Sequence, residues 1–350
     1  MTSPLHGRGA VSSPPNRFER FRYERDPEAD PDEEIGPKTV LMRDSTRTAM
    51  AHNDSPDVGF SYSVNPYRGC EHGCSYCYAR PTHEYLGFSA GLDFETKILV
   101  KEDAPELLRK ELSSPRWEPQ TVAISGVTDA YQPIERKLRI TRRCLEVFAE
   151  FRNPVAIVTK NELVARDADL LSELARYGAA AVFVSVTTLD AELARKLEPR
   201  ASAPERRLAA IEALAKAGVP VGVLVAPVIP AITDHEMPRI LEAVARAGAS
   251  TAGYVVLRLP GAVADVFSAW LEEHFPDRKE KVLGRVRDLR GGVLYDPRWG
   301  IRQVGTGAIA DEIGQLFTIA RRKAGLSERS FELSAAAFRR PERTPQLSLF

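Results

Sequence analysis

The sequence lacks an excess of charge of either sign and lacks a long apolar run. Its 350 residues include 48 Lys and Arg and 48 Asp and Glu, so the formal net charge is zero. A neutral chain has no overall field that draws it to nucleic acid or to a membrane, so such binding must come from local patches. No stretch approaches the roughly 18 apolar residues of a membrane span, and the first residues lack the apolar core of a secretory signal. We therefore expect a soluble, cytoplasmic protein that does not bind membranes.

Cysteine is also scarce, with four residues in the chain, too few for a disulfide framework. Three of them, Cys70, Cys74 and Cys77, lie within eight residues in the pattern C-x3-C-x2-C. In a cytoplasmic protein such spacing favours metal or redox chemistry over disulfides. The fourth, Cys144, lies on the apolar face of a helix predicted over 137–152, where a free cysteine packs as a small hydrophobic residue.

Short apolar segments alternate with helical patterns about every thirty residues. The segments rich in Val and Ile, which predict buried strands, are 121–126, 155–160, 181–186, 219–228 and 252–259. The helical patterns cover 137–152, 162–177, 204–217 and 234–247, and we expect a further strand near 94–100. This alternation is typical of parallel sheets in α/β proteins. A dinucleotide-binding GxGxxG is missing after the first strand, which favours a partial barrel whose catalytic groups gather at the carboxyl ends of the strands.

The composition divides the chain into four parts. Residues 1–35 are rich in Pro, Arg, Asp and Glu and predict a flexible charged arm. The partial barrel is expected over 38–260, a mainly helical extension over 261–326, and a flexible tail over 327–350. Within the extension, we expect Trp299 to fill the core rather than to stack on a ligand.

The three clustered cysteines admit two kinds of metal centre. Three thiolates do not complete a tetrahedral zinc site, but His72 or His83 could supply the fourth ligand. Alternatively, three thiolates can hold three irons of a [4Fe–4S] cluster, which normally takes four cysteines. The fourth iron would then be open to a substrate or cofactor.

This stretch resembles the signature of the radical S-adenosylmethionine (radical SAM) superfamily, C-x3-C-x-aromatic-C, with Tyr76 in the aromatic position. The resemblance implies a partial (β/α)6 barrel, a [4Fe–4S] cluster on Cys70, Cys74 and Cys77, and S-adenosylmethionine (SAM) on the open iron. It also implies that one electron, from a reductant protein such as flavodoxin or ferredoxin, cleaves SAM to methionine and a 5′-deoxyadenosyl radical.

Segments at the ends of the predicted strands resemble the branch related to spore photoproduct lyase, a DNA repair enzyme. These segments are 126–135, 159–161, 185–187 and 226–230. The resemblance implies that SAM is surrounded by Tyr76, Thr128, Asp129, Lys160, Ser185 and Ala226. The ammonium of Lys160 can pair with the methionine carboxylate of SAM. A structural interpretation stays open beside this one: an ion pair of Asp129 with Lys160, and turn or cap hydrogen bonds of Thr128 and Ser185.

One loop departs from the lyase pattern. The lyase has its hydrogen-donor cysteine in the sequence Cys-Thr-Ser-Asp, where this chain has Gly126, Val127, Thr128 and Asp129. A thiol donor is therefore missing at this position. We predict that Tyr78, directly after the cluster motif, is catalytic and relays hydrogen; the alternative is that Tyr78 only packs against its neighbours.

Two further segments bear on nucleic acid. The arginines of 197–211, beside a helix N-terminus, form a candidate phosphate track. The segment 346–350 resembles the consensus by which bacterial proteins bind the DNA polymerase sliding clamp, and Gln346, Leu347, Ser348, Leu349 and Phe350 match it at every position.

We therefore predict a radical SAM enzyme, lyase-like, that acts on DNA in repair and is recruited by the sliding clamp. The alternatives are a non-catalytic zinc-stabilised adaptor in DNA metabolism and a radical SAM enzyme that modifies RNA or another substrate.

Overall fold

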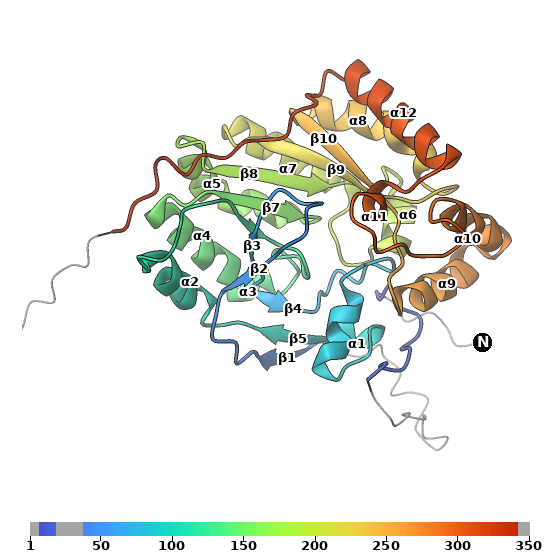
Figure 1. The fold of residues 1–350 in the computed structure, drawn as a ribbon, viewed down its shortest axis with the longest axis horizontal. Coiled ribbons are helices and arrows are strands. Elements are labelled where there is room, and N and C mark those ends of the chain that lie inside the picture. Colours follow the sequence, from blue (N-terminus) through green and yellow to red (C-terminus); the bar gives the residue numbers. More distant parts are fainter. Residues whose placement is uncertain (1–6, 19–37, 342–350) are drawn as a thin grey trace, which may run out of the picture.

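A computed structural model describes residues 7–18 and 38–341 (Figure 1). Its main sheet has seven strands in the order β10-β9-β8-β7-β6-β3-β2. The strands are β2 (Met50–His52), β3 (Tyr62–Val64), β6 (Val122–Ile124), β7 (Val155–Thr159), β8 (Ala180–Ser185), β9 (Val221–Val228) and β10 (Thr251–Val256). From β3 to β10 all neighbours are parallel, and only β2 is antiparallel to its neighbour. Six parallel strands in an open sheet confirm the predicted α/β partial barrel.

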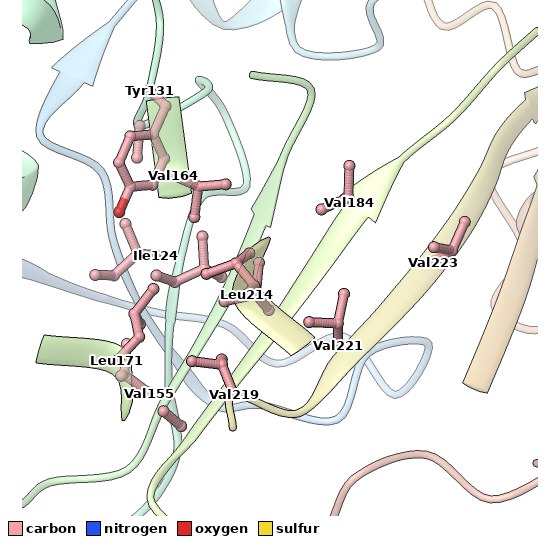
Figure 2. Packing of buried hydrophobic residues seen from close by; sticks show 14 of the residues in the cluster. Ile124, Tyr131, Val155, Val164, Leu171, Val184, Leu214, Val219, Val221 and Val223 are labelled. Carbon is pink, nitrogen blue, oxygen red and sulfur yellow. The ribbon is translucent and has the colours of Figure 1, made fainter. Parts of the chain in front are cut away.

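Helices connect the parallel strands and cover the sheet. They are α3 (Glu135–Leu138), α4 (Ile140–Phe151), η3 (Glu162–Asp167), α5 (Ala168–Ala175), α6 (Ala191–Leu197), α7 (Pro204–Lys216), η4 (Asp234–Glu236) and α8 (Met237–Arg246). Figure 2 shows the core between sheet and helices, where Val155 and Leu171 are fully buried. Cys144 is also fully buried in this core, as its helical spacing predicts.

A second, three-stranded sheet carries the cysteines. It contains β1 (Val40–Arg43), β5 (Lys97–Val100) and β4 (Tyr67–Arg68), in that order. The chain between β4 and β5 holds the cysteine motif, η2 (Arg80–Leu86) and α1 (Leu92–Thr96), and α2 (Ala104–Ser113) follows β5. The strand expected over 94–100 therefore begins only at Lys97 and belongs to this small sheet. The barrel opens instead with β3, which is too short for its pattern to be seen in the sequence.

The helical extension follows β10. It consists of α9 (Val263–His274), η5 (Pro276–Arg278), α10 (Lys279–Asp288), α11 (Ile301–Val304) and α12 (Ala308–Lys323). Helix α12 packs against α8. Helices α9 and α10 bury Trp270 in an apolar core that also contains Leu197, Cys74 and Tyr76. The extension therefore forms part of the wall around the cysteines. No helix in the described ranges is long and apolar enough to cross a membrane.

Two terminal segments differ from the flexible arms expected there. In the N-terminal strap (residues 7–18), Ala10 is fully buried and Asn16 nearly so. The C-terminal strap (residues 327–341) runs from α12 across the outside of the molecule (Figure 1). Its Ser334 amide donates to the carbonyl of Gly178 at 2.9 Å, and its Phe338 packs against the main core. Both straps are fixed by long-range contacts that composition does not reveal.

Candidate functional site

The three motif cysteines lie in one loop between β4 and η2. The amide of Cys70 donates to the carbonyl of Phe94 at 2.9 Å, and the amide of Cys77 donates to the carbonyl of Cys74 at 3.2 Å. Cys70 and Cys77 share an apolar contact group with Phe94, while Cys77 also borders the core that contains Cys74. Cys77 therefore links the other two thiols.

Cys70 and Cys74 are buried, and Cys77 is partly buried. Burial raises the pKa of Cys77, and the neighbouring Cys70 raises it further, to about 11. Burial also raises the pKa of Cys74, and the negative charge of Glu198 adds to that rise. A positively charged metal centre would favour the loss of protons from such thiols at neutral pH. Ser75 adds a buried hydroxyl that has no hydrogen-bond partner among the described residues.

The donor set is compatible with an iron–sulfur cluster. Across residues 7–18 and 38–341, no group of three or more His, Cys, Asp or Glu side chains is arranged to hold one metal ion. Thiolates that each bind a different iron do not converge on one point, so this arrangement is compatible with a cluster. Cys70, Cys74 and Cys77 are the residues that would hold it.

Both candidate histidines already have other partners. His72 Nδ1 lies 3.3 Å from the carboxylate of Asp129, and its Nε2 lies 3.0 Å from the side-chain nitrogen of Asn161. Burial lowers the pKa of His72, but the charges of Asp129 and Cys70 outweigh burial and raise it to about 10. His83 Nε2 lies 2.9 Å from the carbonyl oxygen of Lys97. A fourth zinc ligand from either histidine would require these contacts to break.

Buried charges support the back of the cysteine loop. The guanidinium of Arg80 donates to the carbonyl of Cys74 at 2.7 and 3.0 Å, and it pairs with Glu95 at 2.5 Å. Both side chains are fully buried. Glu95 also accepts hydrogen bonds from the amides of Gly9 at 3.1 Å and Ala10 at 2.8 Å in the N-terminal strap. Arg80 and Glu95 therefore fix the loop and the strap together.

Three of the predicted SAM residues meet at the carboxyl ends of neighbouring strands. Lys160 follows β7, and its ammonium lies 2.8 Å from Ser185 Oγ of β8 and 2.9 Å from the carbonyl of Ala226 in β9. It also lies 3.1 Å from Thr187 Oγ1 and 3.1 Å from Glu198. An ammonium has three N–H donors, so these four acceptors exceed what Lys160 can satisfy at one time.

Glu198 is the central residue that the sequence analysis missed. It accepts hydrogen bonds from Tyr76 and Arg207, and all three side chains are buried. Burial raises the pKa of Glu198, but the charges of Arg207 and Lys160 outweigh burial and hold it well below its usual range. Tyr76 thus reaches the Lys160 network through Glu198. In the sequence, Glu198 stands before a proline and nine residues before Arg207. Because several arginines surround it, this pattern does not single it out.

The arginines of the predicted phosphate track are paired with acids instead. Arg207 is buried against Glu198, Arg200 lies 3.1 Å from Glu71, and Arg206 lies 2.7 Å from Glu162. Arg207 is therefore not available to phosphate, while the phosphate track over 197–211 stays a prediction for Arg200 and Arg206.

Thr128 contacts the start of the cysteine loop, and Asp129 contacts the end of β7. Thr128 Oγ1 donates to the carbonyl of Gly69 at 2.7 Å. Asp129 accepts hydrogen bonds from Thr159 Oγ1 at 2.7 Å and from the backbone amide of Lys160 at 2.8 Å. The alternative of an ion pair between Asp129 and Lys160 is therefore wrong, because the Lys160 ammonium pairs with Glu198.

Tyr78 lies at the loop where the lyase pattern has its donor cysteine. Its hydroxyl donates to the carbonyl of Gly126 at 2.6 Å, while 46% of the residue remains exposed. The guanidinium of Arg258 lies 4.1 Å from the Tyr78 ring centroid. Gly126 has φ +132°, and a Cβ built there meets nothing nearer than Asn65 at 3.8 Å. Tyr78 is thus placed beside open space, next to Cys77. The predicted clamp residues 346–350 lie outside the described residues.

Comparisons with known proteins identify the family of the chain. A family model described as "Radical SAM superfamily" matches residues 64–244, just over half of the chain. The uncharacterized protein Rv2578c of Mycobacterium tuberculosis is 39% identical over 243 residues, which cover 69% of this chain and 70% of that protein. The uncharacterized protein MJ0683 of Methanocaldococcus jannaschii is 29% identical over 184 residues, 53% of this chain and 66% of that protein.

Solved structures share the fold. A spore photoproduct lyase mutant matches with a TM-score of 0.59 and 20% identity, over 82% of this chain and 80% of that chain. A spore photoproduct lyase complexed with dinucleoside spore photoproduct matches with a TM-score of 0.57 and 21% identity, over 81% of this chain and 78% of that chain. These structural matches show that the chain has the fold of a radical SAM partial barrel.

Proposed function

The chain belongs to the radical SAM superfamily, and from this premise we propose that it is an enzyme that cleaves SAM reductively on a [4Fe–4S] cluster held by Cys70, Cys74 and Cys77. The observation that carries the proposal is the set of three neighbouring thiols, two buried and one partly buried, beside the strand-end network of Lys160. When bound, the reduced cluster supplies the electron that converts SAM to methionine and a 5′-deoxyadenosyl radical.

The Lys160 network is suited to hold the methionine carboxylate of SAM. Four acceptors compete for three N–H donors of Lys160, so a carboxylate can replace one of them without leaving a buried donor unpaired. Arg207 remains beside Glu198, so the Glu198 carboxylate keeps a positively charged partner. We infer that Ser185 and the carbonyl of Ala226 orient the ammonium.

Tyr78 is the proposed hydrogen relay. Tyr78 is about half exposed, and its hydroxyl donates to the carbonyl of Gly126. Gly126 stands at the position where the lyase pattern has a thiol. Tyr76 contributes differently, because its buried hydroxyl orients Glu198. Thr128 and Asp129 support the site by fixing the cysteine loop.

For the substrate we propose DNA, supported by the shared fold with spore photoproduct lyase. For recruitment we propose the sliding clamp, supported by the match of residues 346–350 to its binding consensus. The described chain before that segment is bound to Ser114 and Trp117, below the N-terminal end of β6 and away from the cysteines. Clamp binding at that end would leave the mouth of the barrel accessible. The electron donor would be a flavodoxin or ferredoxin.

The experiment that tests the central proposal is anaerobic reconstitution with iron and sulfide. The expected product is a brown protein whose visible absorbance is bleached by dithionite and which forms 5′-deoxyadenosine from SAM. A colourless protein that retains stoichiometric zinc instead would overturn the proposal and support the adaptor alternative.

Recruitment is tested separately. Deletion of residues 346–350 should abolish binding to purified sliding clamp, with an affinity of about micromolar in the full chain, and should leave SAM cleavage unchanged. Equal clamp binding by both proteins would remove the segment from this role.

A further inference from the structure

The barrel is open along one side, between its two edge strands. β10 and β2 lie at opposite ends of the seven-stranded sheet and are not neighbours. A polar contact closes this side, and we call it the edge clasp: Ser55 and Asp57 on one edge, Gly300, Arg302 and Gln303 on the other. The amide of Gly300 donates to the Asp57 carboxylate at 2.6 Å, and Gln303 donates to the Asp57 carbonyl at 3.1 Å. Arg302 donates to both Asp57 and Ser55.

Trp299 lies directly beside the edge clasp and is 51% exposed. The prediction that it fills the core is therefore wrong. Its neighbours are both fixed, because Gly300 binds Asp57 and Arg298 donates to Asp296 at 2.6 Å. The Arg302 guanidinium lies 3.9 Å from the indole centroid. An exposed aromatic ring held between two anchored residues loses little conformational entropy when a flat ligand stacks on it.

A strip of residues connects Trp299 with the mouth of the barrel. The buried guanidinium of Arg290 donates to the carbonyl of Ile301 at 2.7 Å and to the carbonyl of Leu257 at 3.0 Å, so it joins the residue before Arg302 to the residue before Arg258. Arg258 packs on the Tyr78 ring, and within the described residues it forms no ion pair with an acid. The strip therefore offers a half-exposed aromatic ring at each end and a guanidinium without a carboxylate partner between them.

We propose that this strip, Trp299, Arg302, Arg258 and Tyr78, binds an unpaired segment of DNA, with a base stacked on Trp299 and a phosphate on Arg258. Base–aromatic stacking is tolerant of sequence because every base has a π-face, and a guanidinium matches phosphate geometry. The charge balance supports a polyanion, because Asp57 neutralises Arg302 while Arg258 has no acidic partner within the described residues. The proposal rests on the proposed function, because the strip ends at Tyr78, directly after Cys77. Damage in duplex DNA would reach it as a locally unpaired base.

The test is binding of fluorescently labelled oligothymidylate without SAM, measured by anisotropy with the reconstituted protein. Trp299→Ala should weaken binding by about tenfold or more, and Trp299→Phe should restore most of it, since phenylalanine also stacks. Arg258→Gln should weaken binding and reduce its dependence on salt by about one counterion. Tyr85→Ala is the matched control, because Tyr85 is 72% exposed under Arg17 but lies on η2, outside the strip. Its affinity should equal that of the wild type.

Intrinsic fluorescence gives a second readout. Of the three tryptophans, Trp117 and Trp270 are 8% and 0% exposed, so iodide quenches mainly Trp299. Oligothymidylate should protect this fluorescence from iodide. Equal affinity of Trp299→Ala and wild type, an equal loss in Tyr85→Ala, or a strong preference for oligouridylate would overturn the proposal. Formation of 5′-deoxyadenosine is measured separately without DNA, so failure of the SAM chemistry is distinguishable from failure of the strip.

Discussion

The two sides of the cysteine loop both contain arginine, but they differ in the exposure and pairing of their side chains. On the covered side, Arg80 and Glu95 are fully buried and paired, and the N-terminal strap lies over them. On the open side, Tyr78 and Trp299 are about half exposed, and Arg258 has no acidic partner within residues 7–18 and 38–341. On the covered side, Arg80 fixes the backbone of the cysteine loop. On the open side, Arg258 is available to an anion. The covered side therefore fixes the cysteine loop, and the open side remains accessible for chemistry.

The largest expected effect comes from removing a thiol of the cysteine loop. Cys70→Ala, Cys74→Ala and Cys77→Ala should each abolish cluster assembly, because each loses one thiolate ligand. The fold should survive, since the barrel core does not include the cluster. Iron and sulfide analysis after reconstitution checks this. Cys144→Ala is the matched control, because this buried thiol lies in the main core, and it should keep full iron. Near wild-type iron in any of the first three variants would contradict the ligand assignment.

The covered side should be sensitive to the loss of one charge. Arg80→Ala leaves Glu95 buried and unpaired and should lower the free energy of unfolding by about 3–5 kcal/mol, measured by urea denaturation. Arg246→Ala, which removes an exposed pair with Glu242, should cost at most about 1 kcal/mol. If the two variants lose similar stability, Arg80 does not anchor the loop as described.

At the mouth, Lys160→Ala should leave cluster assembly intact and weaken SAM binding by about ten- to a hundredfold. A charge-assisted hydrogen bond to a carboxylate contributes roughly 1.5–3 kcal/mol. Calorimetric titration of SAM into reconstituted protein measures the effect. Lys216→Ala, at an exposed lysine paired with Glu212, should bind SAM as the wild type does. An unchanged dissociation constant in Lys160→Ala would exclude Lys160 from the SAM site.

Glu198 should make stability depend on acid pH. Its folded pKa is held well below the ordinary value of 4.5, so its charged form stabilises the fold above pH 4.5, and this contribution is lost as pH falls below that value. A single such group steepens the decline by at most about 1.4 kcal/mol per pH unit. Urea unfolding between pH 5 and pH 3 should therefore show a shallower decline in Glu198→Gln than in the wild type. Parallel pH profiles would show that Glu198 does not titrate below its ordinary range.

The smallest effect is expected at the N-terminal strap. A Cβ built on Gly9 lies 1.6 Å from the carbonyl oxygen of Gly73, so Gly9→Ala must displace the strap from the cysteine loop. We expect a loss of about 1 kcal/mol of unfolding free energy and faster amide hydrogen exchange at Gly9 and Ala10. Gly59→Ala, which meets nothing within 4 Å, is the control. Unchanged exchange in Gly9→Ala would show that the strap does not need this close contact.

The sequence predicts those parts of the site that depend on local spacing. The interval between the cysteines, the apolar strands and the polar residues at their ends are local patterns, and Lys160, Ser185 and Ala226 do meet. Glu198 was missed because its importance comes from Tyr76 and Lys160, which lie on separate elements. A lysine after a strand predicts a charge at the mouth, but it does not reveal which acid will pair with it.

Exposure was harder to predict than position. A tryptophan among glycines favours the core on composition alone, yet Trp299 is held outward because Gly300 and Arg302 are bound to a loop more than 240 residues away in sequence. The straps were predicted as flexible for the same reason: their polar composition gives no sign that the rest of the fold offers them hydrogen-bond partners. Long-range partners of this kind are not visible in a single sequence.

The C-terminal strap also has a consequence for the order of folding. Its Arg340 donates to the carbonyl of Trp117, 223 positions earlier in the chain, and its Arg339 donates to the carbonyl of Glu150, 189 positions earlier. Contacts with such large sequence separation carry a high loop-closure entropy and form late. During synthesis the barrel strands leave the ribosome well before these arginines do. We therefore expect the strap to dock after the sheet that it crosses has assembled.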